Sequence, residues 1–439
     1  MFKMKYSGIK SIGNIPHEWN IKKCKYITKF VNGYAFDSNA MQKSGKYPII
    51  RIGDINGETI DLDNCLYVDD NVGLKKYKIR KDDLLLAMSG ATVGKTGYSY
   101  IDQDAYINQR VGIIRSLNNR FINYYLRTEY FQEYVNLISV GSAQPNISST
   151  NFGEFKISTP DIKEQKLIAD FLDEKVDIID NIICDLNNQI EILNKYKNQM
   201  ISEVVTSGLN KKVAMKDSEV EWIGSIPEHW NIKLIKNICS LKGRIGWEGL
   251  TKDEYISEGP TLITGINFNN GSIDWDSCEH VSEWRYNQNK SIQIKNKDLL
   301  ITKDGTVGKV AIVKDCPEKV TLNSGVLLLR PLNNEYIEKY LYYVLLSNEF
   351  WHWFEIENIG NTTIIHLYQN RFAKFKLALP PIDEQIRIVD YLDKKCSEIE
   401  EILNSKIKQK EQMEQYKKSV IYEYVTGKKR VEGAEELYV

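Results

Sequence analysis

"PDIKEQKLIADFLDEK", from Pro160 to Lys175, is the stretch that decides the fold, because the chain contains it twice. The second copy, "PPIDEQIRIVDYLDKK", runs from Pro380 to Lys395. Each copy opens with proline and acidic residues, which favour the first turn of a helix. Neither glycine nor proline interrupts residues 161–207, and Gly208 then supplies a helix stop. We therefore predict two long helices, over residues 161–207 and 382–426.

Other segments are duplicated in the same order. "SIGNIPHEWNIKK" begins at Ser11 and is matched by "WIGSIPEHWNIKL" from Trp222. "YKNQMISEVVT" begins at Tyr196 and is matched by "YKKSVIYEYVT" from Tyr416. An ordered set of repeats of this length indicates duplication of one half of the chain. The material between the matched segments agrees only in patches, which predicts one scaffold that carries two dissimilar binding surfaces.

The first long helix has the apolar spacing of a coiled coil. Its apolar residues alternate by four and three positions, at Leu172, Val176, Ile179, Ile183, Leu186, Ile190 and Leu193. The second copy begins alike, with Leu392, Cys396, Ile399 and Leu403. It then has Lys406 and Lys410 where the first copy has Leu186 and Ile190, so a perfect seam is not expected there. We interpret the two helices as an antiparallel pair that covers both apolar stripes; two unrelated core helices are the alternative.

The rest of the chain is typical of short strands mixed with helices. Apolar runs such as "DLLLAMSG" and "DLLITKDG" are punctuated by Gly, Asn and Asp, as strands joined by turns are. The predicted fold is mixed α/β, with two globular domains, two long antiparallel coiled-coil helices and a pseudo-two-fold internal repeat. The expected domains are residues 1–157 and 209–377, with the long helices in residues 158–208 and 378–439.

Composition limits the classes of function. The 439 residues include 42% hydrophobic and 27% charged residues, with no apolar run of membrane-spanning length. Seven scattered cysteines without a C-x-x-C pair predict reduced thiols in a cytoplasmic protein. The net charge of −1 hides an uneven distribution: residues 1–157 carry 21 Lys and Arg against 15 Asp and Glu, whereas residues 209–377 carry 21 of each. A nucleic-acid partner is therefore allowed but not required.

No catalytic, cofactor or metal site is predicted. The five histidines form no H-x-x-x-H pair, and no G-x-S-x-G motif is present. "LLAMSGATVGKTG", from Leu85 to Gly97, has three residues between Gly90 and Gly94, where a phosphate-binding loop needs four. Its second copy, "LLITKDGTVGKVA", has Val310 in place of the magnesium-binding hydroxyl. We interpret this stretch as a turn of the domain fold, whose lysine is a candidate DNA phosphate contact.

Two further features have two interpretations each. The aromatic stretches "FINYYLRTEYFQEYVNLI" and "YIEKYLYYVLLSNEFWHWF" form either helical core or a base-stacking platform, and core is the favoured interpretation. The polar segments "GSAQPNISSTN" and "GNTTIIHLYQN" that follow them either read base edges or form ordinary turns.

The ordered motifs "IG-x-IP-x-x-W", "D-x-L-(L/I)…G-T-V-G-K" (with Ala91 inserted after the glycine in the first copy) and "P-x-x-EQ-x-x-I-x-x-(F/Y)-L-D-x-K" each occur in both halves and resemble the specificity subunit of type I restriction–modification systems. The resemblance covers nearly the whole chain. It implies that residues 22–157 and 233–377 each read one half of a split double-stranded DNA target. It also implies that the helices bind two methylation subunits and set the length of the unread gap. The partner subunits would bind S-adenosylmethionine and flip out an adenine, and a restriction subunit can join.

The chain itself has no methyltransferase motif and is expected to be non-catalytic. A stand-alone two-headed DNA-binding protein and a protein-binding helical scaffold are the alternatives. The candidate DNA contacts in the first half are Lys43, Lys46, Lys95, Gln144 and Asn146. Those in the second half are Arg244, Lys303, Lys309, Thr362 and His366.

Overall fold

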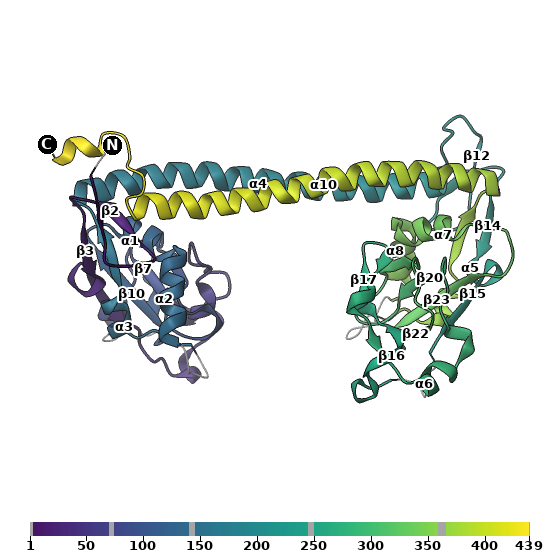
Figure 1. Ribbon diagram of the computed structural model, residues 1–439, viewed down its shortest axis with the longest axis horizontal. Coiled ribbons are helices and arrows are strands. Elements are labelled where there is room, and N and C mark those ends of the chain that lie inside the picture. Colours follow the sequence, from purple (N-terminus) through teal and green to yellow (C-terminus); the bar gives the residue numbers. More distant parts are fainter. Residues whose placement is uncertain (1–2, 70–73, 140–144, 245–249, 359–365, 439) are drawn as a thin grey trace. The chain divides into compact units, whose positions relative to one another are not determined.

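The computed structural model describes residues 3–69, 74–139, 145–244, 250–358 and 366–438 (Figure 1). The chain divides into two compact units. Unit 1 comprises Met1–Asn187 and Lys408–Val439, and unit 2 comprises Asn188–Ile407. The division differs from the four expected domains, because each long helix contributes one part to unit 1 and the other part to unit 2.

Unit 1 is built on an antiparallel four-stranded sheet in the order β4-β10-β7-β8. These strands are β4 (Thr28–Asn32), β10 (Val111–Ser116), β7 (Leu84–Ala87) and β8 (Thr96–Tyr98). A second sheet has the order β6-β5-β9, in which β5 and β9 are parallel. It contains β6 (Leu66–Val68), β5 (Tyr47–Ile50) and β9 (Tyr106–Ile107). Two-stranded pairs join β1 (Met4–Tyr6) to β2 (Asn14–Pro16), and β3 (Asn20–Lys23) to β11 (Lys156–Thr159).

Unit 2 repeats this topology. Its four-stranded sheet has the order β15-β23-β20-β21, with β15 (Cys239–Gly243), β23 (Val326–Pro331), β20 (Leu299–Thr302) and β21 (Val310–Ile312). Its second sheet is β19 (Glu279–His280), β16 (Ile256–Ile263) and β22 (Val320–Leu322), again with one parallel pair. The two-stranded pairs are β12 (Met215–Asp217) with β13 (Ser225–Pro227), β14 (Asn231–Leu234) with β24 (Lys376–Leu379), and β17 (Phe268–Asn269) with β18 (Ser272–Ile273). The predicted mixed α/β fold and the internal repeat are confirmed.

The aromatic stretches form core helices. They are α1 (Asn119–Leu126) and α2 (Glu129–Ser139) in unit 1, and α7 (Glu338–Leu346) and α8 (Asn348–Glu357) in unit 2. Their largest aromatic side chains are buried in the apolar cores: Phe121, Tyr125, Phe131, Tyr340, Phe350 and Trp353. These rings cannot stack on bases, so the core interpretation is confirmed for them. The shorter helices are α3 (Ser149–Glu154), α5 (Ile235–Ile238), α6 (Glu283–Asn287) and α9 (Gln369–Phe372).

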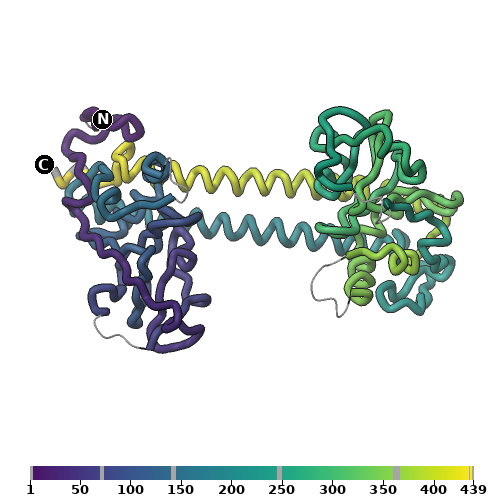
Figure 2. Tube along the Cα trace, turned by 90° about the horizontal axis from the view of Figure 1, so that it is seen from below, coloured from purple at the N-terminus to yellow at the C-terminus, as the bar shows by residue number. Residues whose placement is uncertain are grey.

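The two predicted long helices are α4 (Ile162–Ser207) and α10 (Ile382–Val425). In unit 1 their segments lie side by side and run antiparallel (Figures 1 and 2). The Lys417 ammonium lies 2.7 Å from the Asp180 carboxylate, and the rings of Phe171 and Tyr424 are 4.4 Å apart. The segments in unit 2 also run antiparallel, since Lys197 pairs with Glu400 at 2.8 Å and Gly208 lies beside Glu384.

The predicted apolar seam is present, with varying depth. Leu172, Val176, Ile179 and Leu186 are buried, whereas Ile183, Ile190 and Leu193 are half-buried. The second-copy lysines at seam positions, Lys406 and Lys410, are half-buried as well. Within the described ranges, no helix is long and apolar enough to cross a membrane.

The C-terminal segment completes unit 1 rather than unit 2. After α10, Gly427 has a φ of 73°, and a Cβ at this position would lie 2.4 Å from Pro16. Glycine is therefore required there by both the backbone and the close approach. Lys428 donates to the carbonyl of Ile12, and Figure 2 shows the C-terminal segment beside the N-terminal one. The last helical turn is η11 (Ala434–Tyr438).

Candidate nucleic-acid interface

The repeated Thr-Val-Gly-Lys turn is an element of the fold. It joins β7 to β8 in unit 1 and β20 to β21 in unit 2. Gly94 and Gly308 both have a positive φ, of 82° and 84°. A Cβ on Gly94 would lie 3.2 Å from Val135 in α2, and one on Gly308 would lie 2.3 Å from Trp351 in α8. The glycines let the turn pack against a core helix, which confirms its interpretation as part of the domain fold.

Four chain segments meet at one end of β7, and we call them loop edge 1: residues 51–54, 88–92, 108–110 and 145–148. The Met88 amide donates to the Arg110 carbonyl at 2.9 Å, and the Ile147 amide donates to the Met88 carbonyl at 2.8 Å. The Asn108 amide donates to the Ile50 carbonyl at 2.9 Å. These bonds bring the predicted turn and the predicted polar segment together.

The matching four segments of unit 2 are loop edge 2: residues 264–267, 303–306, 323–325 and 366–368. The same three hydrogen bonds recur: Lys303 to Gly325 at 2.8 Å, Leu367 to Lys303 at 2.9 Å, and Asn323 to Ile263 at 2.9 Å. The two units therefore present the same hydrogen-bonded backbone frame at equivalent ends of their sheets.

The side chains on this shared frame differ. In loop edge 1, Gln109, Arg110 and Asn146 are exposed polar residues. In loop edge 2, the position of Arg110 is taken by Gly325, and Ile266 is 80% exposed. A shared backbone frame that carries different side chains is the arrangement expected of two units that bind different ligands.

Loop edge 2 also contains a contact between a histidine and a carboxylate. The Nδ1 atom of His366 contacts the Asp304 carboxylate, and the His366 ring lies 4.4 Å from that of Tyr368. Asp304 occupies the position of Ser89 in loop edge 1 and orients the His366 ring through its Nδ1 atom.

A family model matches the chain over residues 16–192 and 227–409, and its description is the type I restriction modification DNA specificity domain. The chain belongs to this family. Each match covers one copy of the internal repeat, so the specificity domain occurs twice.

Similar proteins span the same length. A protein of Methanocaldococcus jannaschii that is named as the specificity subunit of the type I restriction enzyme MjaX is 28% identical to this chain, and the match covers 96% of each chain. The MjaVIII specificity subunit of the same organism is 23% identical, with 95% of each covered. A chain solved in work on complex assembly and conformational transition of the type I R-M system has a TM-score of 0.69 at 13% identity, covering 93% of this chain and 98% of that one. This last likeness supports the fold.

Asn146, Lys303 and His366 are candidate contacts of this specificity chain that lie on the loop edges. Asn146 forms an isolated β-bridge with Ser89 and is exposed. Lys303 and His366 are half-buried, on segments joined by the bond from Leu367 to Lys303. The half-buried Lys309 lies at the far end of the repeated turn, where its amide donates to the Thr302 hydroxyl at 2.9 Å.

The remaining lysines lie elsewhere in unit 1. Lys43 and Lys46 are exposed in the segment before β5. The Lys46 ammonium lies 5.1 Å from the centre of the Tyr47 ring, and hydrogen bonding to that side chain raises the pKa of Lys46. Lys95 is exposed and lines a cavity of about 560 Å³, together with Glu58 and Lys417. Lys95, the last residue of the repeated turn, therefore lies beside the long helices.

Arg244 does not lie on the surface. It is buried, with Nε donating to the Leu322 carbonyl at 2.9 Å and Nη2 to the Thr321 hydroxyl at 3.3 Å. Its guanidinium is bonded to β22 inside unit 2, away from the surface on which a DNA contact was predicted. The candidates Gln144 and Thr362 lie outside the described residues.

Gln109 and Arg110 are further candidate contacts on loop edge 1, and the sequence patterns did not indicate them. Both stand directly before β10, where the run "RVGIIRS" reads as the start of a strand. Aligning "INQRVGI" with "LNSGVLL" offers a signal, because the exposed pair is replaced by Ser324 and Gly325 in the second copy.

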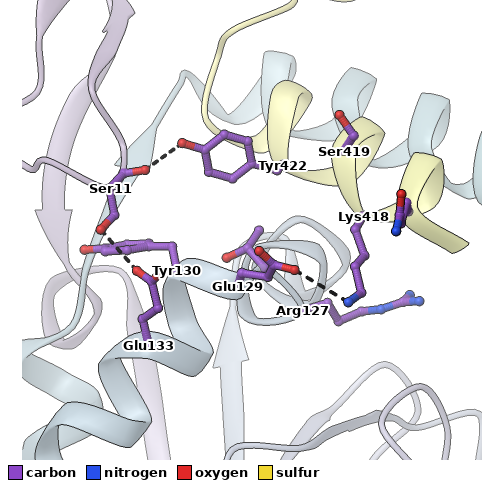
Figure 3. Close-up of a pocket in the computed structure, with 10 residues that line it drawn as sticks. Ser11, Arg127, Glu129, Tyr130, Glu133, Lys418, Ser419 and Tyr422 are labelled. Carbon is purple, nitrogen blue, oxygen red and sulfur yellow. Dashed lines mark hydrogen bonds and ion pairs between the residues drawn. The ribbon is translucent and has the colours of Figure 1, made fainter. Parts of the chain in front are cut away.

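A separate cavity of about 570 Å³ lies in unit 1 between α2, the N-terminal segment and α10 (Figure 3). Glu133 accepts from the Ser11 hydroxyl at 3.2 Å, and Tyr422 donates to the Ser11 carbonyl at 2.6 Å. Glu129 pairs with Lys418 at 3.5 Å. These contacts attach the N-terminal segment and α2 to α10.

Proposed function

We propose that this chain is the DNA-recognition subunit of a type I restriction–modification complex, with unit 1 reading one half of a bipartite target and unit 2 the other. The observation that carries the proposal is the shared hydrogen-bonded frame of the two loop edges with its divergent side chains. Because the family is described as a DNA specificity domain, we take the ligand of the loop edges to be DNA. The chain contributes recognition, and the partner subunits carry out the catalysis.

The chemistry of the loop edges suits base recognition. Arginine and lysine donate to the N7 and O6 atoms of guanine, and amides pair with the N6 and N7 atoms of adenine. Loop edge 1 offers Arg110, Gln109 and Asn146, whereas loop edge 2 offers Lys303 and His366. Different donors on one frame would select different bases in the two half-sites.

The charges of the two halves suggest that partner subunits make part of the contacts to the DNA phosphates. Residues 1–157 have six more basic than acidic residues (21 against 15), but residues 209–377 have equal numbers (21 and 21). Phosphate contacts provide much of the affinity and little of the specificity of DNA binding. The neutral second half would therefore rely on partner subunits for part of its phosphate contacts.

Two methylation subunits are the proposed partners of the long helices, and a restriction subunit can join the complex. The curated relatives are named as subunits of type I restriction enzymes, which supports an assembly of this kind. S-adenosylmethionine would be bound by the methylation subunits, because extraction of the target adenine belongs to the methyltransferase.

The test is expression with the neighbouring methylation subunit in a host without adenine methylation, followed by methylome sequencing. The expected result is co-purification and a methylated motif made of two short half-sites with an unread gap. Exchange of residues 22–157 for the matching region of a relative should change one half-site only. Methylation without a bipartite motif would favour a stand-alone DNA-binding protein, and no DNA dependence would favour a protein-binding scaffold.

A further inference from the structure

Arg110 is one of two arginines of unit 1, with Arg80, whose guanidinium makes no hydrogen bond or ion pair with any described residue, and it is the one that lies on loop edge 1. Other arginines are held by carboxylates: Arg115 by Asp83, Arg120 by Asp170 and Asp173, and Arg127 by Glu58. Arg51 in loop edge 1 is likewise used internally, by Asp54 and the Asn64 carbonyl. Arg110 is exposed, so its five N–H donors are available to an external acceptor.

The backbone at Arg110 is firmly fixed. Its carbonyl accepts from Met88, and the next residue, Val111, starts β10 and pairs with Ala87 in the central sheet. The Val111 amide also donates to the Asn108 carbonyl at 2.9 Å, which closes a tight turn. A long side chain on so rigid a base loses less freedom on binding than one on a mobile loop.

The residues beside Arg110 are of the types that read base edges. Phosphate oxygens accept from arginine, lysine and amide side chains alike, but the commonest specific base contact is an arginine or lysine that donates to both N7 and O6 of guanine, and amides pair in the same bidentate way with adenine. Gln109 precedes Arg110, and Asn146 lies on the segment bridged to Ser89 in the same loop edge. The three residues lie on backbone segments that hydrogen bonds join within loop edge 1, and all three are exposed and polar.

Unit 2 provides an internal comparison. Gly325 occupies the position of Arg110, since the Lys303 amide donates to its carbonyl as Met88 does to Arg110. A Cβ at Gly325 would lie 3.6 Å from Asp304, an ordinary contact, so the fold does not require glycine there. The arginine is thus a feature of loop edge 1 and not of the shared frame.

We infer that Arg110 determines a guanine in the half-site read by unit 1, by donating two hydrogen bonds to its N7 and O6 atoms, and that unit 2 has no equivalent contact. The inference rests on the proposed function of the chain, and it adds the identity of one reading residue and of the base that it selects.

The test uses the full chain with its methylation subunit and compares methylomes. The variants are Arg110→Ala, Arg110→Gln and Arg110→Lys, with Arg80→Ala as the matched control. Arg80 is an exposed arginine of the same unit at the opposite end of β7, and its guanidinium likewise has no partner among the described residues. Exchange of residues 22–157 identifies the half-site that belongs to unit 1.

We expect Arg110→Ala to lower discrimination at one G·C position of that half-site by roughly 5- to 150-fold, the range that one bidentate contact provides. Arg110→Gln should shift this position towards adenine, and Arg110→Lys should keep overall methylation but lose part of the discrimination. The other half-site and the gap should not change. Since a misfolded unit would lose its whole half-site, the other positions of that half-site report that unit 1 is folded.

Three outcomes would overturn the inference. The first is a wild-type half-site of unit 1 without a G·C pair. The second is an Arg110→Ala variant that methylates all sites less while every base stays required, which would indicate a phosphate contact. The third is an equal effect of Arg80→Ala. Failure of the proposed function is distinguishable, because the wild-type chain would then give no bipartite motif.

Discussion

At the scale of single residues, the repeated tryptophan and glutamate are explained by one contact. The Trp19 Nε1 atom donates to Glu164 at 2.9 Å, and the equivalent Trp230 Nε1 atom donates to Glu384 at 3.0 Å. Each bond joins the Ile-Pro turn to the start of a long helix. The second partner of the carboxylate differs, since Arg430 pairs with Glu164 whereas His229 pairs with Glu384.

Glu164→Ala should destabilise unit 1 by roughly 3–5 kcal/mol, because the buried side chain of Arg430 loses its nearest carboxylate, at 2.9 Å, and keeps only the more distant one of Glu18, at 4.0 Å. Thermal unfolding of the full chain measures the loss as a lower Tm for one transition. Glu174→Ala is the matched control: Glu174 is an exposed residue of the same helix, and its removal should leave Tm unchanged. Equal Tm values for the two variants would contradict the prediction.

At the scale of elements, one ion pair and one tyrosine attach the first aromatic helix of each unit to a long helix. In unit 1, Asp173 of α4 accepts from the Tyr124 hydroxyl at 2.7 Å and from Arg120 at 2.5 Å. In unit 2, Asp393 of α10 accepts from Tyr343 at 2.6 Å and from Lys339 at 2.5 Å. Burial, followed by this hydrogen bond, raises the pKa of both tyrosines.

Tyr124→Phe and Tyr343→Phe should each destabilise their own unit by about 1–3 kcal/mol, because a half-buried carboxylate loses one donor. Chemical unfolding followed by circular dichroism would detect the loss. Tyr6→Phe, at an exposed tyrosine, should have no measurable effect. A destabilisation that appears in only one of the two units would show that the repeated contact is not equally important in both.

Much of the element order was predictable, because the repeats mark equivalent positions and the helices lack breakers. The seam residues, the repeated turn and the aromatic core helices followed from spacing and composition. The individual residues proposed to contact DNA could not be predicted in this way. Arg244 and Arg110 are both arginines beside an apolar run, and only tertiary contacts decide that the first bonds to Leu322 inside the core while the second is exposed.

At the scale of the whole molecule, each unit is completed by the long helix of the other repeat. Val420, Ile421 and Val425 of α10 belong to the apolar core of unit 1. In the same way, Met200 and Ile201 of α4 belong to the core of unit 2. The boundaries of the compact units therefore fall in the middle of α4 and of α10, whereas those of the sequence repeats fall after these helices.

A chain ending at Ile407 should lose the cooperative unfolding transition of unit 1 and keep that of unit 2. The deleted residues provide part of the unit 1 core and the partner of Glu164, whereas unit 2 keeps all of its residues. Differential scanning calorimetry of the truncated and full chains measures both transitions. Two intact transitions in the truncated chain would show that the α10 end is dispensable.

Insertion of one heptad after Asn187 and after Ile407, which are equivalent positions, tests the proposed role of the helices in setting the gap. Each helix gains about 10 Å. The methylome should show a longer unread gap with both half-sites kept. Insertion into α4 alone should instead mismatch the helix pair and abolish methylation. A changed half-site in the double insertion would refute the idea that the helices act as a ruler.

The discontinuity of unit 1 also determines when it can fold during synthesis. Unit 2 is one continuous stretch, but unit 1 needs residues 408–439, which leave the ribosome more than 200 residues after its first part. At about 5–20 residues per second, the nascent chain waits on the order of 10–40 s with the apolar stripe of α4 uncovered. The N-terminal unit of this protein is thus the last to be finished, and chaperones that bind nascent chains would meet it first.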